Sequence, residues 1–173
     1  MKKLFVLAAV LFCVNTVFAQ QPEVSRDASG EKVLKGFITR QQLATDTAFS
    51  WFAKNQQGYV PAQNALQALK ANRDSVSIIA FGGTWCHDTQ FILPKFFALA
   101  DAAGVSPERI TVIGVDRNKK TIQHLSETFN ITNVPTIIVM KNGKEIGRVI
   151  EYGKKGMFDM ELGDILNPAN PRP

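Results

Sequence analysis

Cys86 is the residue of this chain best suited to covalent chemistry. It follows an apolar run that ends in the turn Gly82-Gly83-Thr84-Trp85, and it opens a helical pattern that continues to about residue 103. A thiol at the start of a helix faces unpaired backbone N–H groups and the positive end of the helix dipole. Both favour the thiolate and lower the thiol pKa. From placement alone, a nucleophile and a small residue filling a gap in the core are equally good interpretations.

The second cysteine of the 173-residue sequence, Cys13, lies in a segment typical of a secretory signal peptide. Lys2 and Lys3 precede the apolar run 4–14, and a small residue, Ala19, ends the segment. We expect cleavage after Ala19. The apolar core is short for a bilayer span, and the bulky Phe12 argues against lipid attachment at Cys13. The expected product is an exported chain of 154 residues with formal net charge +3 and no stable membrane anchor.

Removal of Cys13 would leave Cys86 as the one thiol of the mature chain. A lone cysteine in an exported protein cannot form an internal disulfide. It is therefore buried and inert, paired with another molecule, or reactive. A dimer linked through Cys86 is one form of the second case.

The residues next to Cys86 modify the expected chemistry. A carboxylate at Asp88 would raise the pKa of the thiol, although an acid in the first turn of a helix also suits the helix dipole. His87 beside Cys86 and Asp88 suggests a metal site. Three adjacent side chains cannot readily point at one ion, so we expect no metal and a solvated histidine. No cofactor is indicated.

The rest of the chain divides into an extension, a domain and a tail. Residues 20–58 form an N-terminal extension, with a flexible lead-in at 20–32, a strand at 33–38 and a helix at 39–55. Residues 59–166 form the main domain, and 167–173 a flexible, proline-rich tail. The predicted elements of the domain are helices near 62–69, 86–103, 121–129 and 156–166, strands at 75–81 and 110–115, and a hairpin at 136–150 with an Asn-Gly turn. This order predicts an α/β fold with a central mixed β-sheet flanked by helices.

Four separated motifs resemble the thioredoxin family. The segment Trp85-Cys86-His87-Asp88-Thr89 is similar to its active-site turn, and Pro94 matches its helix-kinking proline. The segment Val134-Pro135-Thr136 resembles its cis-proline loop, and Lys141-Asn142-Gly143 its hairpin turn. The resemblance covers about residues 60–166 and implies a thioredoxin fold with an N-terminal helical extension. The motif and the leader together look most like exported, periplasmic or secreted, thioredoxin-like proteins of Gram-negative bacteria.

Thr89 stands where the family has its second cysteine. That thiol normally releases the product by closing an internal disulfide, which Thr89 cannot do. Aligned positions also place Ala80 and Val112 where many members have a buried aspartate and lysine, and an apolar pair avoids the cost of burying those charges. The resemblance therefore implies a monothiol protein with Cys86 as nucleophile. The Thr89 hydroxyl either donates a hydrogen bond to the Cys86 sulfur, or Thr89 is a neutral residue of the first helical turn that packs as a cysteine would.

The resemblance also implies a substrate-binding surface around the thiol. Trp85 would shield the thiol and offer an apolar platform, or else pack into the core. The loop of Val134, Pro135 and Thr136 would leave backbone groups free to pair with an extended substrate. The expected partners are a protein or small molecule carrying a disulfide or cysteine, and an external thiol as reductant.

Two functions from different classes remain open on this sequence. The first is thiol–disulfide exchange through a mixed disulfide at Cys86. The second is a redox-inactive module that binds peptides or assists assembly. The basic run Arg117, Lys119 and Lys120 is interpreted as a solvated face, and nucleic-acid binding is not indicated because aromatic and basic residues are not interleaved.

Overall fold

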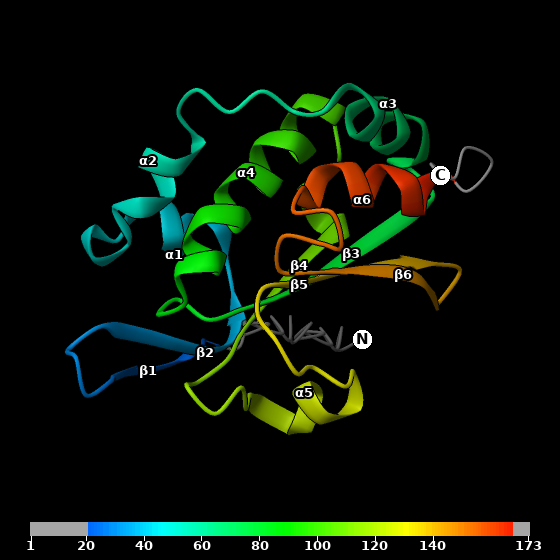
Figure 1. The fold of residues 1–173 in the computed structure, drawn as a ribbon. Helices are drawn as coiled ribbons and strands as arrows, with labels where there is room; N and C mark the ends of the chain where they lie inside the picture. Colours follow the sequence, from blue (N-terminus) through cyan, green and yellow to red (C-terminus); the bar gives the residue numbers. More distant parts are fainter. Residues whose placement is uncertain (1–20, 168–173) are drawn as a thin grey trace, which may run out of the picture.

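The computed structural model describes residues 21–167 and contains one six-stranded sheet (Figure 1). The predicted signal peptide with its cleavage position, and residues 168–173 of the predicted tail, lie outside the described residues. The strands are β1 (Glu23–Arg26), β2 (Lys32–Ile38), β3 (Val76–Gly82), β4 (Ile110–Gly114), β5 (Thr136–Lys141) and β6 (Lys144–Ile150). The helices are α1 (Arg40–Thr45), α2 (Trp51–Gln56), α3 (Gln63–Asn72), α4 (His87–Ala103), α5 (Leu125–Thr128) and α6 (Phe158–Leu166), with short 3-10 turns η1 (Thr47–Phe49), η2 (Pro107–Arg109) and η3 (Ile122–His124).

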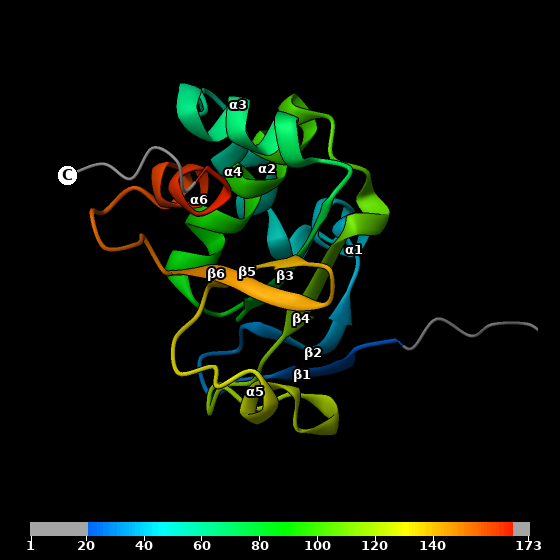
Figure 2. The ribbon, with the colours of Figure 1, turned by 90° about the vertical axis from the view of Figure 1, so that its right-hand side faces the viewer.

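The strands lie in the order β1-β2-β4-β3-β5-β6. β3 and β4 are parallel, and every other neighbouring pair is antiparallel. Helices α1 to α4 and α6 lie on one side of the sheet and α5 on the other (Figures 1 and 2). The prediction of a mixed sheet flanked by helices in a thioredoxin fold is confirmed.

The N-terminal extension contributes strands as well as helices. β1 pairs with β2, and β2 pairs with β4, so the extension adds two strands to one edge of the sheet. The prediction of a flexible lead-in over residues 20–32 is wrong for the described part of that range, residues 21–32. The turn between β1 and β2 is held by Asp27, whose Oδ1 accepts from the backbone N–H groups of Ser29 and Glu31 at 2.9 and 3.0 Å. Gly30 completes the turn with a φ of +83°.

Two of the predicted helices are interrupted. The segment 39–55 begins as expected, with Thr39 in a capping box with Gln42, but it divides into α1, η1 and α2. Asp46 causes the break because its backbone is extended while its side chain accepts from the N–H of Ala48 and starts the next turn. The segment 121–129 is broken at Gln123 and His124, which have positive φ.

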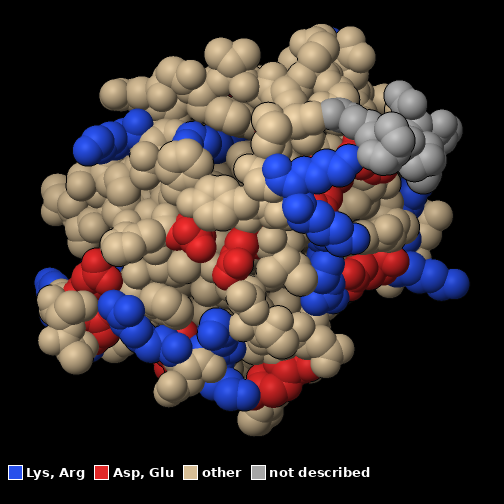
Figure 3. Space-filling model, in the orientation of Figure 1, with Lys and Arg blue, Asp and Glu red and all other residues tan. Residues whose placement is uncertain are grey.

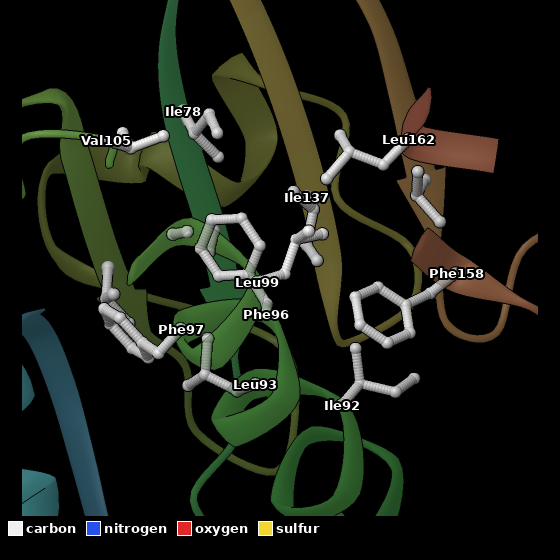
Figure 4. Packing of buried hydrophobic residues seen from close by; sticks show 14 of the residues in the cluster. Ile78, Ile92, Leu93, Phe96, Phe97, Leu99, Val105, Ile137, Phe158 and Leu162 are labelled. Atoms are coloured by element: carbon white, nitrogen blue, oxygen red, sulfur yellow. The ribbon is translucent and has the colours of Figure 1, made fainter. Parts of the chain in front are cut away.

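Buried side chains form a cluster on each side of the sheet. The larger lies between the sheet and helices α2, α3, α4 and α6 and includes Phe96, Leu99 and Leu162 (Figure 4). The smaller faces α5 and includes Phe81, Ile113 and Ile138. α4 thus packs along the sheet, and the short turn of residues 83–86 joins β3 to its start. Within residues 21–167, no helix has the length and apolar character to cross a membrane.

Candidate functional site

Cys86 caps the N-terminus of α4 at the carboxyl end of β3. Its backbone N–H donates to the carbonyl of Gly83 at 2.9 Å, which closes the turn between strand and helix. The side chain is partly buried against the smaller apolar cluster, and it is the free cysteine of the described residues. Its thiol donates to the carbonyl of Val134, with Sγ 3.2 Å from the oxygen. The thiol is therefore held at the surface by one backbone contact from a different element.

That contact comes from the loop before β5, where the Val134–Pro135 peptide bond is cis. Val134 and Thr136 are buried at 2% and 1% exposure, and the Thr136 hydroxyl donates to the carbonyl of Asn133 at 2.7 Å. The Pro135 carbonyl accepts from the N–H of Glu151 at 2.7 Å. The sequence-predicted residues 134–136 thus lie beside Cys86, and the loop presents backbone to the thiol while the Val134 and Thr136 side chains are buried.

Thr89 supports the turn rather than the thiol. Its side chain is 1% exposed, and its Oγ1 accepts from the backbone N–H of Gly83 at 3.2 Å. The hydrogen bond that the structure gives this hydroxyl runs to the turn and not to the sulfur, contrary to the role that the resemblance implied. Ala80 and Val112 are partners in the β3–β4 register and are both buried. The sheet beneath the thiol is therefore apolar at these two positions.

Trp85 is fixed by contacts on its edge and face. Its Nε1–H donates to the carbonyl of Val115 at 3.0 Å, and the guanidinium of Arg117 lies over the ring, 4.9 Å from its centroid. A Cβ at position 83 would lie 2.7 Å from the ring, so Gly83 is needed for this close approach. Arg117 is exposed, as predicted for a solvated face, and its guanidinium also packs on the Trp85 ring.

Thr84 joins the active-site turn to the N-terminal hairpin. Its side chain is buried, and its hydroxyl donates to the carbonyl of Lys32 at 2.8 Å and accepts from the N–H of Leu34 at 3.2 Å. Both partners belong to β2. The hairpin is thus bonded directly to the residue two before Cys86.

Arg117 makes a second connection to the hairpin. Its Nε donates to Asp27 Oδ2 at 2.7 Å, and its Nη2 lies 3.1 Å from the carboxylate of Glu31. The pKa of Asp27 is lowered to about 2 by its hydrogen bonds, chiefly from Ser29 and then from Arg117. Ser29, Glu31 and Arg117 line an open depression of about 460 Å³ that Trp85, Cys86, His87 and Asp88 complete.

Tyr152 approaches the site from the end of β6. Burial raises the pKa of Tyr152, and the neighbouring Asp88 carboxylate raises it further. The ring of Tyr152 also contacts that of Phe91, with 5.9 Å between centroids. Asp88 thus lies close to both Cys86 and a phenol that sequence spacing did not reveal.

Of the residues predicted for the site, Trp85, Cys86, His87 and Asp88 line the depression, and Val134 contacts the thiol. The members that sequence reasoning missed are Ser29, Glu31, Arg117 and Tyr152. The segment Asp27-Ala28-Ser29-Gly30 has the composition of a turn, which is the one signal that points to the hairpin. Within residues 21–167, no three His, Cys, Asp or Glu side chains lie together in a way that could hold a metal ion.

A thiol at the start of α4, facing a cis-proline loop across the end of a mixed sheet, defines a protein with a thioredoxin-type fold and site. The family model Thioredoxin matches residues 60–161, more than half of the chain. The chain belongs to the thioredoxin family. Residues 21–59, which include the hairpin, precede the matched region.

Individual relatives agree with this assignment. A thioredoxin from Echinococcus granulosus is 32% identical over 87 residues, covering 50% of this chain and 76% of the relative. A thioredoxin from Alicyclobacillus acidocaldarius is 28% identical over 105 residues, covering 60% of this chain and 91% of the relative. A crystal structure of a protein of unknown function from Pseudomonas aeruginosa is similar in fold, with a TM-score of 0.56 at 15% identity, covering 78% of this chain and 92% of that one. Family and fold support thiol–disulfide redox chemistry in general.

Proposed function

We propose that the protein performs thiol–disulfide exchange with Cys86 as a single nucleophile and an external thiol as resolving partner. The Cys86 thiolate attacks a substrate disulfide, a bond forms between the two sulfurs, and one half of the substrate leaves as a thiolate. A first external thiol attacks the Cys86 sulfur and releases the other half. A second external thiol then attacks the mixed disulfide between Cys86 and the first external thiol, and the Cys86 thiolate is released. The two external thiols leave as one disulfide and have supplied the two electrons that reduce the substrate.

The observation that carries this proposal is the pairing of a partly exposed Cys86 thiol with the carbonyl of Val134. Deprotonation of Cys86 to the attacking thiolate removes the S–H donor, so the Val134 carbonyl has lost this partner when the mixed disulfide forms. A substrate N–H lying along the loop can then take the place of the thiol. Thr89 and the apolar neighbours Ala80 and Val112 support a single-thiol mechanism, because they offer neither a second thiol nor a buried acid.

The test uses the chain without its leader and a model peptide disulfide. Mass spectrometry of the wild type should detect a peptide adduct on Cys86, and adding glutathione should release it and give turnover. Cys86→Ser should form no adduct and give only the uncatalysed rate. Absence of an adduct on the wild type, or equal turnover by Cys86→Ser, would refute the mechanism.

A binding module without turnover is the second candidate. It is favoured by the same loss of a resolving cysteine and by the hairpin residues Ser29 and Glu31, which line the depression at the thiol and add binding surface beside it. This function predicts that Cys86→Ser keeps the affinity of the wild type for a peptide partner in calorimetry. Loss of that affinity together with the adduct would exclude it.

We also propose that the chain is exported after cleavage behind Ala19 and acts in the periplasm or outside the cell. The charged start, the short apolar run and the small residue at position 19 support this. We further propose that residues 20–58 are an extension to the domain at 59–166. The intact mass of the protein recovered from an expressing Gram-negative cell should begin at Gln20; a mass beginning at Met1 would overturn the export proposal.

A further inference from the structure

The depression at Cys86 has walls from two parts of the chain. Trp85, Cys86 and Asp88 come from the active-site turn and the start of α4, whereas Ser29 and Glu31 come from the hairpin that precedes the matched thioredoxin region. A substrate sulfur that reaches Cys86 through this depression comes close to Ser29 and Glu31. The hairpin is therefore in a position to choose among substrates.

The hairpin wall is anchored at two places. The Thr84 hydroxyl bonds to the backbone of Lys32 and Leu34 on β2. Arg117, stacked on Trp85, bonds to Asp27 and Glu31 in the turn. Because both anchors attach to residues flanking the thiol, the wall keeps a defined position relative to the sulfur.

Carboxylates outnumber cations around this depression. Glu31 lines it from the hairpin and Asp88 from α4, and Glu151 lies at the end of β6, where its N–H bonds to Pro135. Arg117 is the cation among the lining residues, and it is bonded to Asp27 and Glu31. Figure 3 shows acidic side chains near the middle of this face, over the region where α4 begins and β6 ends. The local charge is thus opposite in sign to the net charge of the chain, which is +5 over all residues.

We propose that the Ser29–Glu31 turn of the hairpin determines specificity at Cys86 and, together with Asp88, makes the site select disulfides flanked by positive charge over anionic ones. This rests on the proposed exchange reaction. The substrate class is a cysteine peptide with basic neighbours, or a small cationic disulfide. Anionic disulfides such as oxidised glutathione react slowly in the first step.

The preference for cationic disulfides arises from short-range Coulomb attraction between their charges and the carboxylates of the partly solvated depression. Such attraction acts on the encounter and on the attack, and salt screens it. The thiolate of Cys86 is itself an anion, so part of the preference belongs to any thiolate. The contribution of the hairpin residues is the part of the preference for cationic disulfides that exceeds the preference of a small free thiol.

The test compares cystamine, 2-hydroxyethyl disulfide and dithiodiglycolate, which are cationic, neutral and anionic disulfides of similar size. Adduct formation on Cys86 is timed by mass spectrometry at low salt, with 2-mercaptoethanol as the free-thiol reference. We expect the cystamine-to-dithiodiglycolate rate ratio of the protein to exceed that of the reference by about tenfold, and to fall towards it in 0.5 M salt. In Glu31→Gln the ratio should drop by about threefold or more.

Glu108→Gln is the matched control, because Glu108 is exposed in η2 before β4, at the far end of the sheet from Cys86. Its ratio should equal that of the wild type. Folding of each variant is first checked by circular dichroism, because the thiol of an unfolded chain reacts with the ratio of a free thiol, and Asp88→Asn gives a second measurement of the same effect. Equal ratios for protein and free thiol, or equal ratios in Glu31→Gln and Glu108→Gln, overturn the inference and leave the exchange reaction standing. No adduct with any of the disulfides overturns the exchange reaction itself.

Discussion

Replacing Thr84 with valine removes the hydroxyl that ties the hairpin to the active-site turn while keeping the shape of the side chain. The N–H of Leu34 then loses its acceptor at 3.2 Å, and the carbonyl of Lys32 loses its donor at 2.8 Å. Leu34 is 3% exposed, so water cannot easily replace the hydroxyl there. An unpaired buried polar group costs about 1–3 kcal/mol, so we expect a loss of about 2–4 kcal/mol.

The control is Thr84→Ser, which keeps the hydroxyl and removes one methyl group. Its expected cost is about 1 kcal/mol. Urea unfolding measures both variants. With a slope typical of a small domain, Thr84→Val should lower the midpoint by about 1–2 M and Thr84→Ser by less than half of that.

Hydrogen exchange distinguishes loss of the whole fold from release of the hairpin. If the hairpin separates first, the amide of Leu34 should exchange faster in Thr84→Val while amides of β3 stay protected. The reasoning would be refuted if Thr84→Val matched the wild type in both measurements. It would also be refuted if Thr84→Ser were as unstable as Thr84→Val.

Further predictions concern the thiol, the helix packing and acid stability. Thr89→Cys should restore a resolving thiol beside Cys86, so that the peptide adduct is released without added glutathione, while repeated turnover still needs an external reductant to open the new internal disulfide; an adduct that persists until glutathione is added would contradict this. Gly163→Ala should lower the thermal midpoint, because its Cβ would lie 2.9 Å from the backbone of Ala65 and overpacking costs about 1–3 kcal/mol; an unchanged midpoint would count against close packing of α3 on α6. The lowered pKa of Asp27, about 2, means that its ion pair contributes stability above pH 4 that is lost as pH falls towards 2. In Asp27→Asn the unfolding midpoint should fall less steeply between pH 4 and pH 2 than in the wild type. An equally steep fall in the variant would contradict the ion pair of Asp27 with Arg117.

The elements of the core could be predicted from sequence because each has a strong local pattern. The apolar run 75–81 becomes β3, and the Asn-Gly step at 142–143 becomes the turn of the β5–β6 hairpin, with positive φ at both residues. β1 was not predictable in this way. Its four residues are all exposed, so they show no buried face, and backbone pairing with β2 makes it a strand.

The site could be predicted only where its members are close in sequence or belong to a recognisable motif. Cys86 and the loop of Val134 and Pro135 belong to motifs, and the structure brings them together. The bonds from Arg117 to Asp27 and from Thr84 to Lys32 join residues 90 and 52 positions apart. Neither pair has a local signal, because the register of β2 on β4 creates both contacts.

Placing β2 on β4 also gives the sheet a different outer boundary. Without residues 21–38, the outermost strand on that side would be β4, which carries the buried residues Val112 and Ile113 and would present unpaired backbone groups. With the hairpin present, the boundary is the four-residue β1, which carries the charged side chains of Glu23 and Arg26. Short, charged edge strands resist intermolecular strand pairing. The N-terminal hairpin therefore disfavours strand pairing between molecules, in addition to lining the depression at Cys86.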